Sequence, residues 1–284
     1  MLGIPYMGSK RKLAGKIIDA IIRDNPRAKY FYDLFGGGGS ISLEALKRNQ
    51  FEKVFYNEID SGVVNLLKKI QTEGVTEEFY EWIDRETFHA LKNGSDWKAG
   101  LVKTCWSFGN EGKGYIYGKE IENLKKSTHF YIIENGYLEN RKPEIRIRLL
   151  KEFKEKEKIK NRFDLEHLER LQHLEHLQQL QQLEILNHSY ENVKIETPIE
   201  ETVIYLDPPY FGTATYQNDI DHEKLYNWIQ NSPYTIYMSS YEAPFDVIEQ
   251  FEHRCKFSAT KNNKVIEKLF CNKTSNYSLF SEAI

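Results

Sequence analysis

Four consecutive glycines, at positions 36 to 39, stand between a short aromatic run and a run with helical spacing. The aromatic run, residues 30 to 34, predicts a strand, and residues 41 to 48 predict a helix capped by Ser40. Residues 53 to 57 predict a second strand. This order is a βαβ unit, which requires a parallel sheet with a right-handed crossover. The glycine turn therefore places the chain in the α/β class.

A second apolar run, residues 203 to 206, ends in Asp207-Pro208-Pro209-Tyr210. A continuous apolar run of this length is typical of a strand buried in a parallel sheet. Two prolines donate no backbone hydrogen bond, so they turn the chain out of the sheet and present Asp207 and Tyr210 at the end of the strand. Further elements are predicted as helices at 13–22, 221–231 and 245–251, a strand at 234–238, and a strand pair at 255–260 and 265–271.

The middle of the chain has a different character. Residues 63–70 and 77–91 predict helices, and the glycine-punctuated stretch 105–118 predicts a long ordered loop or a bent hairpin. The segment 141–162 carries ten Lys or Arg and four Glu, a net charge of +6. We therefore expect a Rossmann-like catalytic domain, made of residues 1–60 and 188–284, with a mainly helical insertion at 61–187.

Leucine recurs at every third position from Leu165 to Leu186. On an α-helix a step of three residues turns about 300°, so such a stripe circles the helix instead of forming one apolar face. The content of Leu, Gln and Glu favours a helix over 163–186. A repeating extended coil with a three-residue pattern is the alternative.

Composition and charge exclude several classes of protein. The 284 residues are 40% hydrophobic, enough for a core, and the net charge of -3 argues against a protein that coats nucleic acid by charge alone. Three scattered cysteines, without the spacing of a zinc site, indicate a reduced compartment. We see no signal peptide and no run of about 20 apolar residues, and we expect a cytoplasmic protein that needs no metal.

The glycine turn indicates a ligand at the edge of the sheet, because such turns bring backbone close to a bound molecule. Glu58 follows the next strand, where a carboxylate accepts hydrogen bonds from ribose hydroxyls. Sites for nicotinamide cofactors and for S-adenosylmethionine share both features. A phosphate-binding P-loop is disfavoured because Ser40 and Ile41 follow the glycines, and Ile41 also replaces the third glycine of the nicotinamide fingerprint. A tight turn without a ligand stays open at this point.

Asp207-Pro208-Pro209-Tyr210 suits the methylation of an amine conjugated to a base. Such an amine is a poor nucleophile, and the Asp207 carboxylate and the Pro208 carbonyl can hold its two N–H groups. Tyr210 can stack on the base, which is worth about 1–3 kcal/mol. Asp and Pro are also common turn residues, so an ordinary turn is the competing interpretation.

Four segments together resemble the Dam-like (D12 class) family of adenine-specific DNA methyltransferases, which includes bacteriophage members. They are Tyr6-Met7-Gly8-Ser9-Lys10, the stretch from Asp33 to Ser40, Asn57-Glu58-Ile59-Asp60, and Asp207-Pro208-Pro209-Tyr210. Their order, with the cofactor motif first, then the recognition region and then the catalytic tetrapeptide, looks like the α arrangement of amino-methyltransferases. Residues 106–110 and Tyr115 look like a family loop near the target base.

The resemblance implies S-adenosylmethionine as cofactor and a flipped-out adenine of double-stranded DNA as substrate, in a bacterial or phage-infected cell. It implies catalytic roles for Asp207, Pro208, Pro209 and Tyr210. The cofactor residues that we expect are Tyr6, Lys10, Asp33, Phe35, Gly36, Gly38, Glu58, Ile59 and Asp207. The residues that we expect to bind DNA are Asn110, Tyr115, Arg141, Lys142, Arg146 and Arg148.

Two other functions remain open on the sequence. The enzyme could methylate the exocyclic amine of cytosine, or an amino group of RNA or protein. The chain could also be a DNA-binding protein on an inactive methyltransferase fold, although intact Lys10, Glu58, Asp207 and Tyr210 argue against decay.

Overall fold

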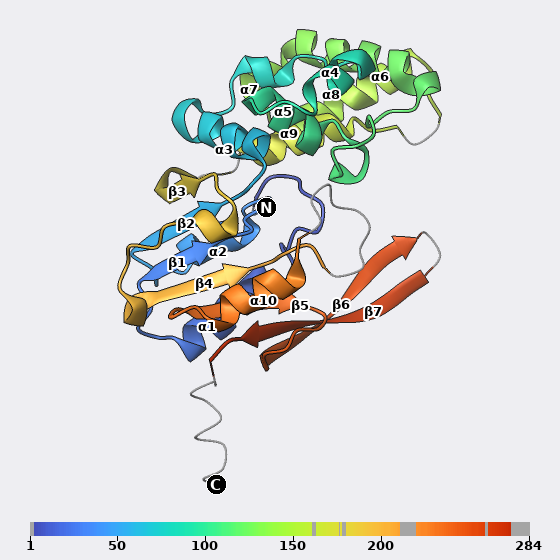
Figure 1. Cartoon of the computed structure of the whole chain (residues 1–284). Helices are drawn as coiled ribbons and strands as arrows, with labels where there is room; N and C mark the ends of the chain where they lie inside the picture. The colour runs from blue at the N-terminus through green and yellow to red at the C-terminus, as the bar shows by residue number, and fades with distance from the viewer. Residues whose placement is uncertain are drawn as a thin grey trace. The chain divides into compact units, whose positions relative to one another are not determined.

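The computed structural model describes residues 3–160, 163–175, 177, 180–210, 220–258 and 261–273, without the side chains of 253–258 and 261–264. The chain forms two compact units, drawn in Figure 1. We call them the sheet unit, Lys10–Ile59 with Gln182–Ile284, and the helical unit, Gly3–Ser9 with Asp60–Gln181. The unit boundaries fall at 59/60 and 181/182, a few residues from the boundaries expected from the sequence.

The sheet unit is built on a seven-stranded sheet with the order β3-β2-β1-β4-β5-β7-β6. The first five strands in this order are parallel. At the other end β7 pairs antiparallel with β5, and β6 pairs antiparallel with β7. Its strands and helices are α1 (Ala14–Asp24), β1 (Tyr30–Asp33), α2 (Ser40–Lys47), β2 (Lys53–Asn57), β3 (Leu183–Leu186), β4 (Thr202–Leu206), α10 (His222–Gln230), β5 (Thr235–Ser240), β6 (Asp246–Ser258) and β7 (Lys261–Cys271), with short 3-10 turns η5 (Tyr190–Asn192) and η6 (Ile199–Glu201). The Rossmann-like α/β class is confirmed.

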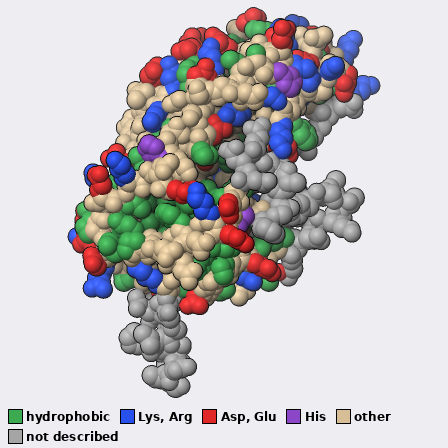
Figure 2. All heavy atoms as spheres, viewed as in Figure 1, with side chains coloured by type: hydrophobic (Ala, Val, Ile, Leu, Met, Phe, Trp, Pro, Cys, Tyr) green, Lys and Arg blue, Asp and Glu red, His purple; other side chains and the backbone are tan. Residues whose placement is uncertain are grey.

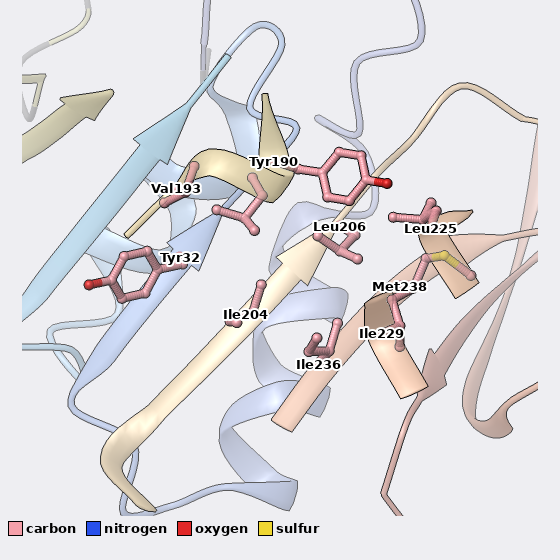
Figure 3. Close-up of a cluster of buried hydrophobic side chains, with 10 residues drawn as sticks. Tyr32, Tyr190, Val193, Ile204, Leu206, Leu225, Ile229, Ile236 and Met238 are labelled. Atoms are coloured by element: carbon pink, nitrogen blue, oxygen red, sulfur yellow. The ribbon is translucent and has the colours of Figure 1, made fainter. Parts of the chain in front are cut away.

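The core of the sheet unit explains why the apolar runs form these strands. All five residues of β4 are buried, because both neighbours of β4 are strands and its two faces are covered. Figure 3 shows Ile204 and Leu206 of β4 beside Ile236 and Met238 of β5, with α10 contributing Leu225 to the same cluster. The phenol of Tyr32 stacks on Phe55 of the adjacent strand, with ring centroids 4.1 Å apart.

The helical unit contains α3 (Ser61–Glu73), η1 (Glu77–Tyr80), α4 (Arg85–Leu91), α5 (Trp97–Cys105), η2 (Phe108–Asn110), α6 (Lys119–Ile132), the π-turn η3 (Ile133–Tyr137), α7 (Leu138–Asn140), α8 (Pro143–Lys156), α9 (Glu166–Glu175) and η4 (Leu180–Gln182). Aspartates begin three of its helices: the side chains of Asp60, Asp84 and Asp96 each accept a hydrogen bond from a first-turn N–H. No helix among the described residues has the length and hydropathy needed to cross a membrane.

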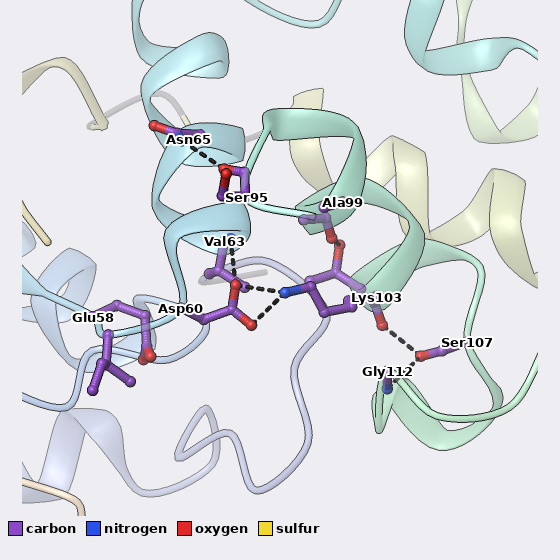
Figure 4. Close-up of polar contacts among 12 residues, drawn as sticks. Glu58, Asp60, Val63, Asn65, Ser95, Ala99, Lys103, Ser107 and Gly112 are labelled. Carbon is purple, nitrogen blue, oxygen red and sulfur yellow. Dashed lines mark hydrogen bonds and ion pairs between the residues drawn. The ribbon is translucent and has the colours of Figure 1, made fainter. Parts of the chain in front are cut away.

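Helices α3 and α5 approach each other closely through two glycines. A Cβ added at Gly100 would lie 2.1 Å from the carbonyl oxygen of Gly62, so only glycine allows this backbone contact. Figure 4 shows the polar link beside it, in which the Lys103 ammonium reaches both carboxylate oxygens of Asp60 at 2.5 and 2.6 Å. The same carboxylate accepts the N–H of Val63, so one side chain both caps α3 and pairs with α5.

The leucine repeat does not form the single helix predicted over 163–186. It divides into α9, a segment with three-residue turns and strand β3. In the middle segment Leu177 N–H bonds to Leu174 and Leu180 N–H bonds to Leu177, and this i to i−3 pattern has the three-residue period of the sequence. The leucines of the repeat are buried from Leu165 to Leu183, because the described backbone changes conformation where a continuous α-helix would turn them outward.

Three further local predictions were wrong. Residues 245–251 were predicted to be helical and lie in β6, because their backbone pairs with residues 267–271 of β7 over a much longer hairpin than expected. Residues 77–91 divide into η1 and α4 around an extended break. Ser40 is the first residue of α2, whose N-cap is Gly39 with a left-handed φ of 74°.

The contact between α3 and α5 generates a stability prediction. Gly100→Ala forces backbone apart, and we expect it to lower the unfolding free energy of the helical unit by about 1–3 kcal/mol, as overpacking does elsewhere. Gly114→Ala is the matched control, because nothing lies within 4 Å of its added Cβ and its φ is not positive. Urea unfolding of both variants measures the difference, and equal midpoints would contradict the close contact.

Candidate active site

Three neighbouring strands carry the candidate site residues at their carboxyl ends. Strand β1 lies between β2 and β4, and all three are parallel, with Asp33 in register with Tyr56 on one side and Tyr205 on the other. Asp33 ends β1, Glu58 follows β2 and Asp207 follows β4. From β1 the strand order continues through β2 to β3 on one side and through β4 to β5 on the other. Ligands of open α/β sheets bind at such a reversal of strand order.

The glycine turn after β1 is tight because a tyrosine fills the space beside it. A Cβ at Gly36 would lie 2.2 Å from the Tyr56 ring, so that position admits only glycine. The Tyr56 hydroxyl donates to the carbonyl of Gly37 at 2.7 Å, and the N–H of Gly36 donates to the Asn57 carbonyl at 2.8 Å. Tyr56 and Asn57 of β2 thus fix the path of the turn.

Glu58 is tied to the same turn. Its carboxylate is buried and accepts the backbone N–H of Gly37 at 2.8 Å. Asn187, which follows β3, donates to the Glu58 carbonyl at 2.7 Å. The acidic residue predicted to meet a ribose therefore stands directly against the glycine backbone.

Asp33 is buried, with 1% of its surface exposed. One carboxylate oxygen accepts the Ser42 hydroxyl at 2.7 Å, and the other has no hydrogen-bond partner among the described residues. The pKa of Asp33 is raised to about 7, mainly by burial, with the Ser42 hydrogen bond lowering it and the negative charges of Asp207 and Glu58 adding to the rise. A buried acceptor without a donor is the feature of a site built for a polar ligand.

Asp207 is held by a buried lysine. The Lys10 ammonium lies 2.8 Å from one Asp207 oxygen, and the two side chains are only 9% and 19% exposed. Burial raises the pKa of Asp207 to about 6; Lys10 acts in the opposite direction, and the charge of Glu267 adds to the rise. Lys10 and Asp207, 197 positions apart by their numbers in the sequence, are thus brought together in the sheet unit.

Tyr210 is oriented on several sides. Its hydroxyl donates to Glu267 at 3.0 Å and lies 3.5 Å from Asp207. The Lys10 ammonium lies over its ring, 4.9 Å from the centroid, and Tyr241 packs edge-on at 4.7 Å. Burial, followed by the nearby carboxylates, raises the pKa of Tyr210, so the phenol stays protonated and acts as a donor.

The structure distributes the remaining predicted cofactor residues more widely. Gly38 is buried in the turn, and Phe35 packs on Tyr190 with ring centroids 5.4 Å apart. Ile59 is exposed. Tyr6 belongs to the helical unit and is partly buried there. Pro208 is buried and Pro209 partly so, as expected where the chain leaves the sheet.

The arginines expected to bind DNA have partners within the helical unit. Arg146 is 7% exposed and bonds to Gln172 and Glu169 at 3.1 and 2.8 Å. Arg141 donates to the Val75 carbonyl at 2.6 Å and also meets Glu175. Both guanidiniums therefore already have carboxylate, amide or carbonyl partners within the helical unit.

The other expected DNA residues differ in their exposure. Lys142 is exposed, and Arg148 is exposed beside Glu152, one helical turn away. Tyr115 is buried, and its hydroxyl donates to the Ile83 carbonyl at 2.7 Å, which places it in the core of the unit. Asn110 stands in the glycine loop with a positive φ of 59°.

Charged side chains of both signs are scattered over the face of the molecule in Figure 2. The basic segment follows this pattern, because Lys151 lies 3.9 Å from Glu155, one turn away on α8. A pocket of about 660 Å³ opens beside this helix; it is lined by Ile147, Leu150, Lys151, Lys154, Glu155, Lys158, Ile159, Lys160, Phe163 and Asp164. Among the described residues, no group of three or more His, Cys, Asp or Glu could hold a metal ion.

Sequence reasoning missed three residues of the site. Glu267 and Tyr241 contact Tyr210, and Ser42 holds Asp33. Neither Glu267 nor Tyr241 belongs to a motif, since only the pairing of β5 with β7 brings residue 267 to the end of β4. Ser42 lies three residues beyond the glycines, in the first turn of the predicted helix. Its place beside the end of the preceding strand could have indicated a contact with Asp33.

Comparison with known proteins identifies the family of the chain. A search of curated proteins gives no significant match. The model of the D12 class N6 adenine-specific DNA methyltransferases matches residues 6–270, nearly the whole chain, and includes every site residue described above. The match disfavours cytosine, RNA or protein as the substrate. With its glycine turn, buried Lys10–Asp207 pair and double-proline elbow, this chain belongs to the D12 class N6 adenine-specific DNA methyltransferases, which methylate adenine in DNA.

Proposed function

We propose that the methyl donor is S-adenosylmethionine, and that the carboxyl ends of β1, β2 and β4 bind it beside a flipped-out adenine of double-stranded DNA. The observation that carries this proposal is the convergence of Asp33, Glu58 and Asp207 at the ends of three adjacent strands. An open α/β sheet binds its ligand at that place.

The residues present fit this cofactor. The unpaired buried oxygen of Asp33 is an acceptor for a donor group of the ligand. The Glu58 carboxylate, held by the N–H of Gly37, can accept several hydrogen bonds at once, as the two hydroxyls of a ribose require. The absence of a side chain at Gly36 lets Tyr56 pack directly against the turn and hold its backbone in place.

The catalytic residues act on the amine of the adenine. When bound, S-adenosylmethionine supplies an electrophilic methyl group. The Asp207 carboxylate and the Pro208 carbonyl accept the two N–H bonds of the amine and direct its lone pair. Lys10 keeps Asp207 in its ionised form, because an opposite charge at 2.8 Å opposes the cost of burial. The ring of Tyr210 provides a surface on which the base stacks.

The helical unit supplies the surface for DNA in this proposal. Extruding a base costs a few kcal/mol, which contacts to the DNA must offset. Lys142 and Arg148 are exposed on or beside α8 and suit phosphate contact. Phe108, 69% exposed, and Asn110 lie on the glycine loop 105–118, the segment expected near the target base.

Removal of the Asp207 carboxylate tests the catalytic role. We expect Asp207→Ala to lower turnover by at least about 10²-fold with the fold retained, because an acceptor used in the reaction is lost. The assay is transfer of labelled methyl to DNA, followed by nucleoside analysis. Asp246→Ala, at the exposed start of β6, is the matched control. Turnover near the control level would remove Asp207 from the mechanism.

Glu58 tests the cofactor site separately. Glu58→Ala removes the ribose acceptor and loosens the glycine turn, so we expect weaker binding of S-adenosylmethionine, by about tenfold or more, with little change in DNA affinity. Calorimetric titration measures the first and a gel-shift assay the second. Glu52→Ala is the control, because Glu52 is exposed and precedes β2, at the end of the strand opposite Glu58. An unchanged cofactor titration would exclude Glu58 from the site.

The raised pKa of Asp207 predicts an acid limit to activity. The carboxylate must be ionised to accept N–H groups, and its pKa rises from 3.8 to about 6. The single-turnover rate should therefore be constant above this value and fall as the pH drops through about 6. The measurement uses saturating cofactor and DNA, so that a change in the ionisation of Asp33 that weakens ligand binding does not affect the rate. A rate that stays constant down to pH values near the ordinary aspartate pKa would contradict the assignment.

A further inference from the structure

Glu267 is a buried acid in contact with two site residues. It lies on β7, far in sequence from every motif, and only 3% of its surface is exposed. One of its oxygens accepts the Tyr210 hydroxyl at 3.0 Å and lies 3.5 Å from the Lys10 ammonium. The same atom therefore faces both side chains that flank Asp207.

The sheet explains how a distant strand reaches the site. Strand β5 pairs with β4 on one side and with β7 on the other, where Ser240 is in register with Lys268. On its far side Glu267 is in register with Phe251 of β6. Glu267 therefore lies next to the last residue of β7 that pairs with β5 and is itself paired with β6, which holds its backbone within the sheet.

Burying this carboxylate carries a free-energy cost that packing alone does not explain. A charge taken out of water is destabilising unless it is paired and hydrogen-bonded, and a neutral or apolar residue would avoid the cost. Here two carboxylates, Glu267 and Asp207, share one ammonium. A buried cluster of a lysine, two carboxylates and a tyrosine, with a shifted pKa at Asp207, is typical of a functional site.

We propose that Glu267 is a positioning residue of the methyl transfer, which holds the Tyr210 hydroxyl and the Lys10 ammonium so that Asp207 and the tyrosine ring are presented to the adenine amine. It rests on the roles proposed above for Asp207 and Tyr210. Glu267 itself does not touch the reacting atoms; it acts through the two side chains that it contacts.

The charge of Glu267 also acts on Asp207. The charged and titratable groups around Asp207 are Lys10 from the N-terminal segment, Asp33 at the end of β1, Tyr205 of β4, Tyr210 after it and Glu267 of β7. Glu267 raises the pKa of Asp207 and Lys10 lowers it. A neutral residue at position 267 removes the repulsion between the two carboxylates, while the attraction of Lys10 for Asp207 remains. The pKa of Asp207 therefore falls.

Three variants separate the charge of Glu267 from its reach. Glu267→Gln keeps the size of the side chain and removes its charge, whereas Glu267→Asp keeps the charge and shortens the side chain. Glu249→Gln on β6 is the control, because the Glu249 carboxylate pairs with the exposed Arg23. We expect kcat to fall about tenfold in both Glu267 variants, because misplaced catalytic groups slow the reaction, with KM for DNA and cofactor nearly unchanged. The control should match the unmodified protein.

The pH profile distinguishes positioning from simple structural support. In Glu267→Gln the acid limit of the single-turnover rate should move to lower pH, and in Glu267→Asp it should stay in place. Urea unfolding confirms that each variant is folded. An unmoved acid limit in Glu267→Gln, or a kcat equal to that of the control, would overturn the proposal. If Glu267→Gln does not fold, Glu267→Asp decides, and full kcat there would overturn it.

The test also separates this inference from the proposed function. Loss of activity in Asp207→Ala with normal behaviour of both Glu267 variants would reject the positioning role alone. Retained activity in Asp207→Ala would reject the catalytic assignment on which the inference rests.

Discussion

The charge balance around one buried lysine supports the candidate site at the edge of the sheet. Lys10 pairs with Asp207 and lies near Glu267, and its ammonium also lies over the ring of Tyr210. Burial disfavours the ionised form of each carboxylate, and the nearby Lys10 ammonium opposes this effect at Asp207 and lowers its pKa. The helix that begins at Ala14, just after this lysine, anchors it to the sheet unit.

Parallel strand pairing brings the other acids to the same edge. Strand β1 has β2 and β4 as neighbours, so the residues that follow each strand meet without any long loop. The turn after β1 is held by Tyr56 below it and by Glu58 at its side. A rigid turn and fixed acids lower the ordering cost when a ligand binds, which is the advantage of a preformed site.

The sequence predicted much of this site because its information is local. A strand followed by glycines and a helix, or an apolar run followed by two prolines, has one reasonable backbone outcome, and Asp33, Glu58 and Asp207 stand at the expected strand ends. Pairing between distant segments has no comparable local pattern in the sequence. The helix predicted at 245–251 became a strand because β7 offers it hydrogen bonds, and the leucine repeat changed conformation to keep its side chains buried.

The sequence by itself determined the α/β class, the family and the residues that its motifs contain, because those depend on residue type and short spacing. Only the tertiary structure decided which charged side chains are exposed and which are paired inside the protein. It buried Arg146 against Glu169, although the net charge of its segment indicated phosphate contact, and it set Glu267 against Tyr210. Burial and pairing are properties of segments that meet in space, and the identity of a charged residue does not reveal whether water or a partner will face it.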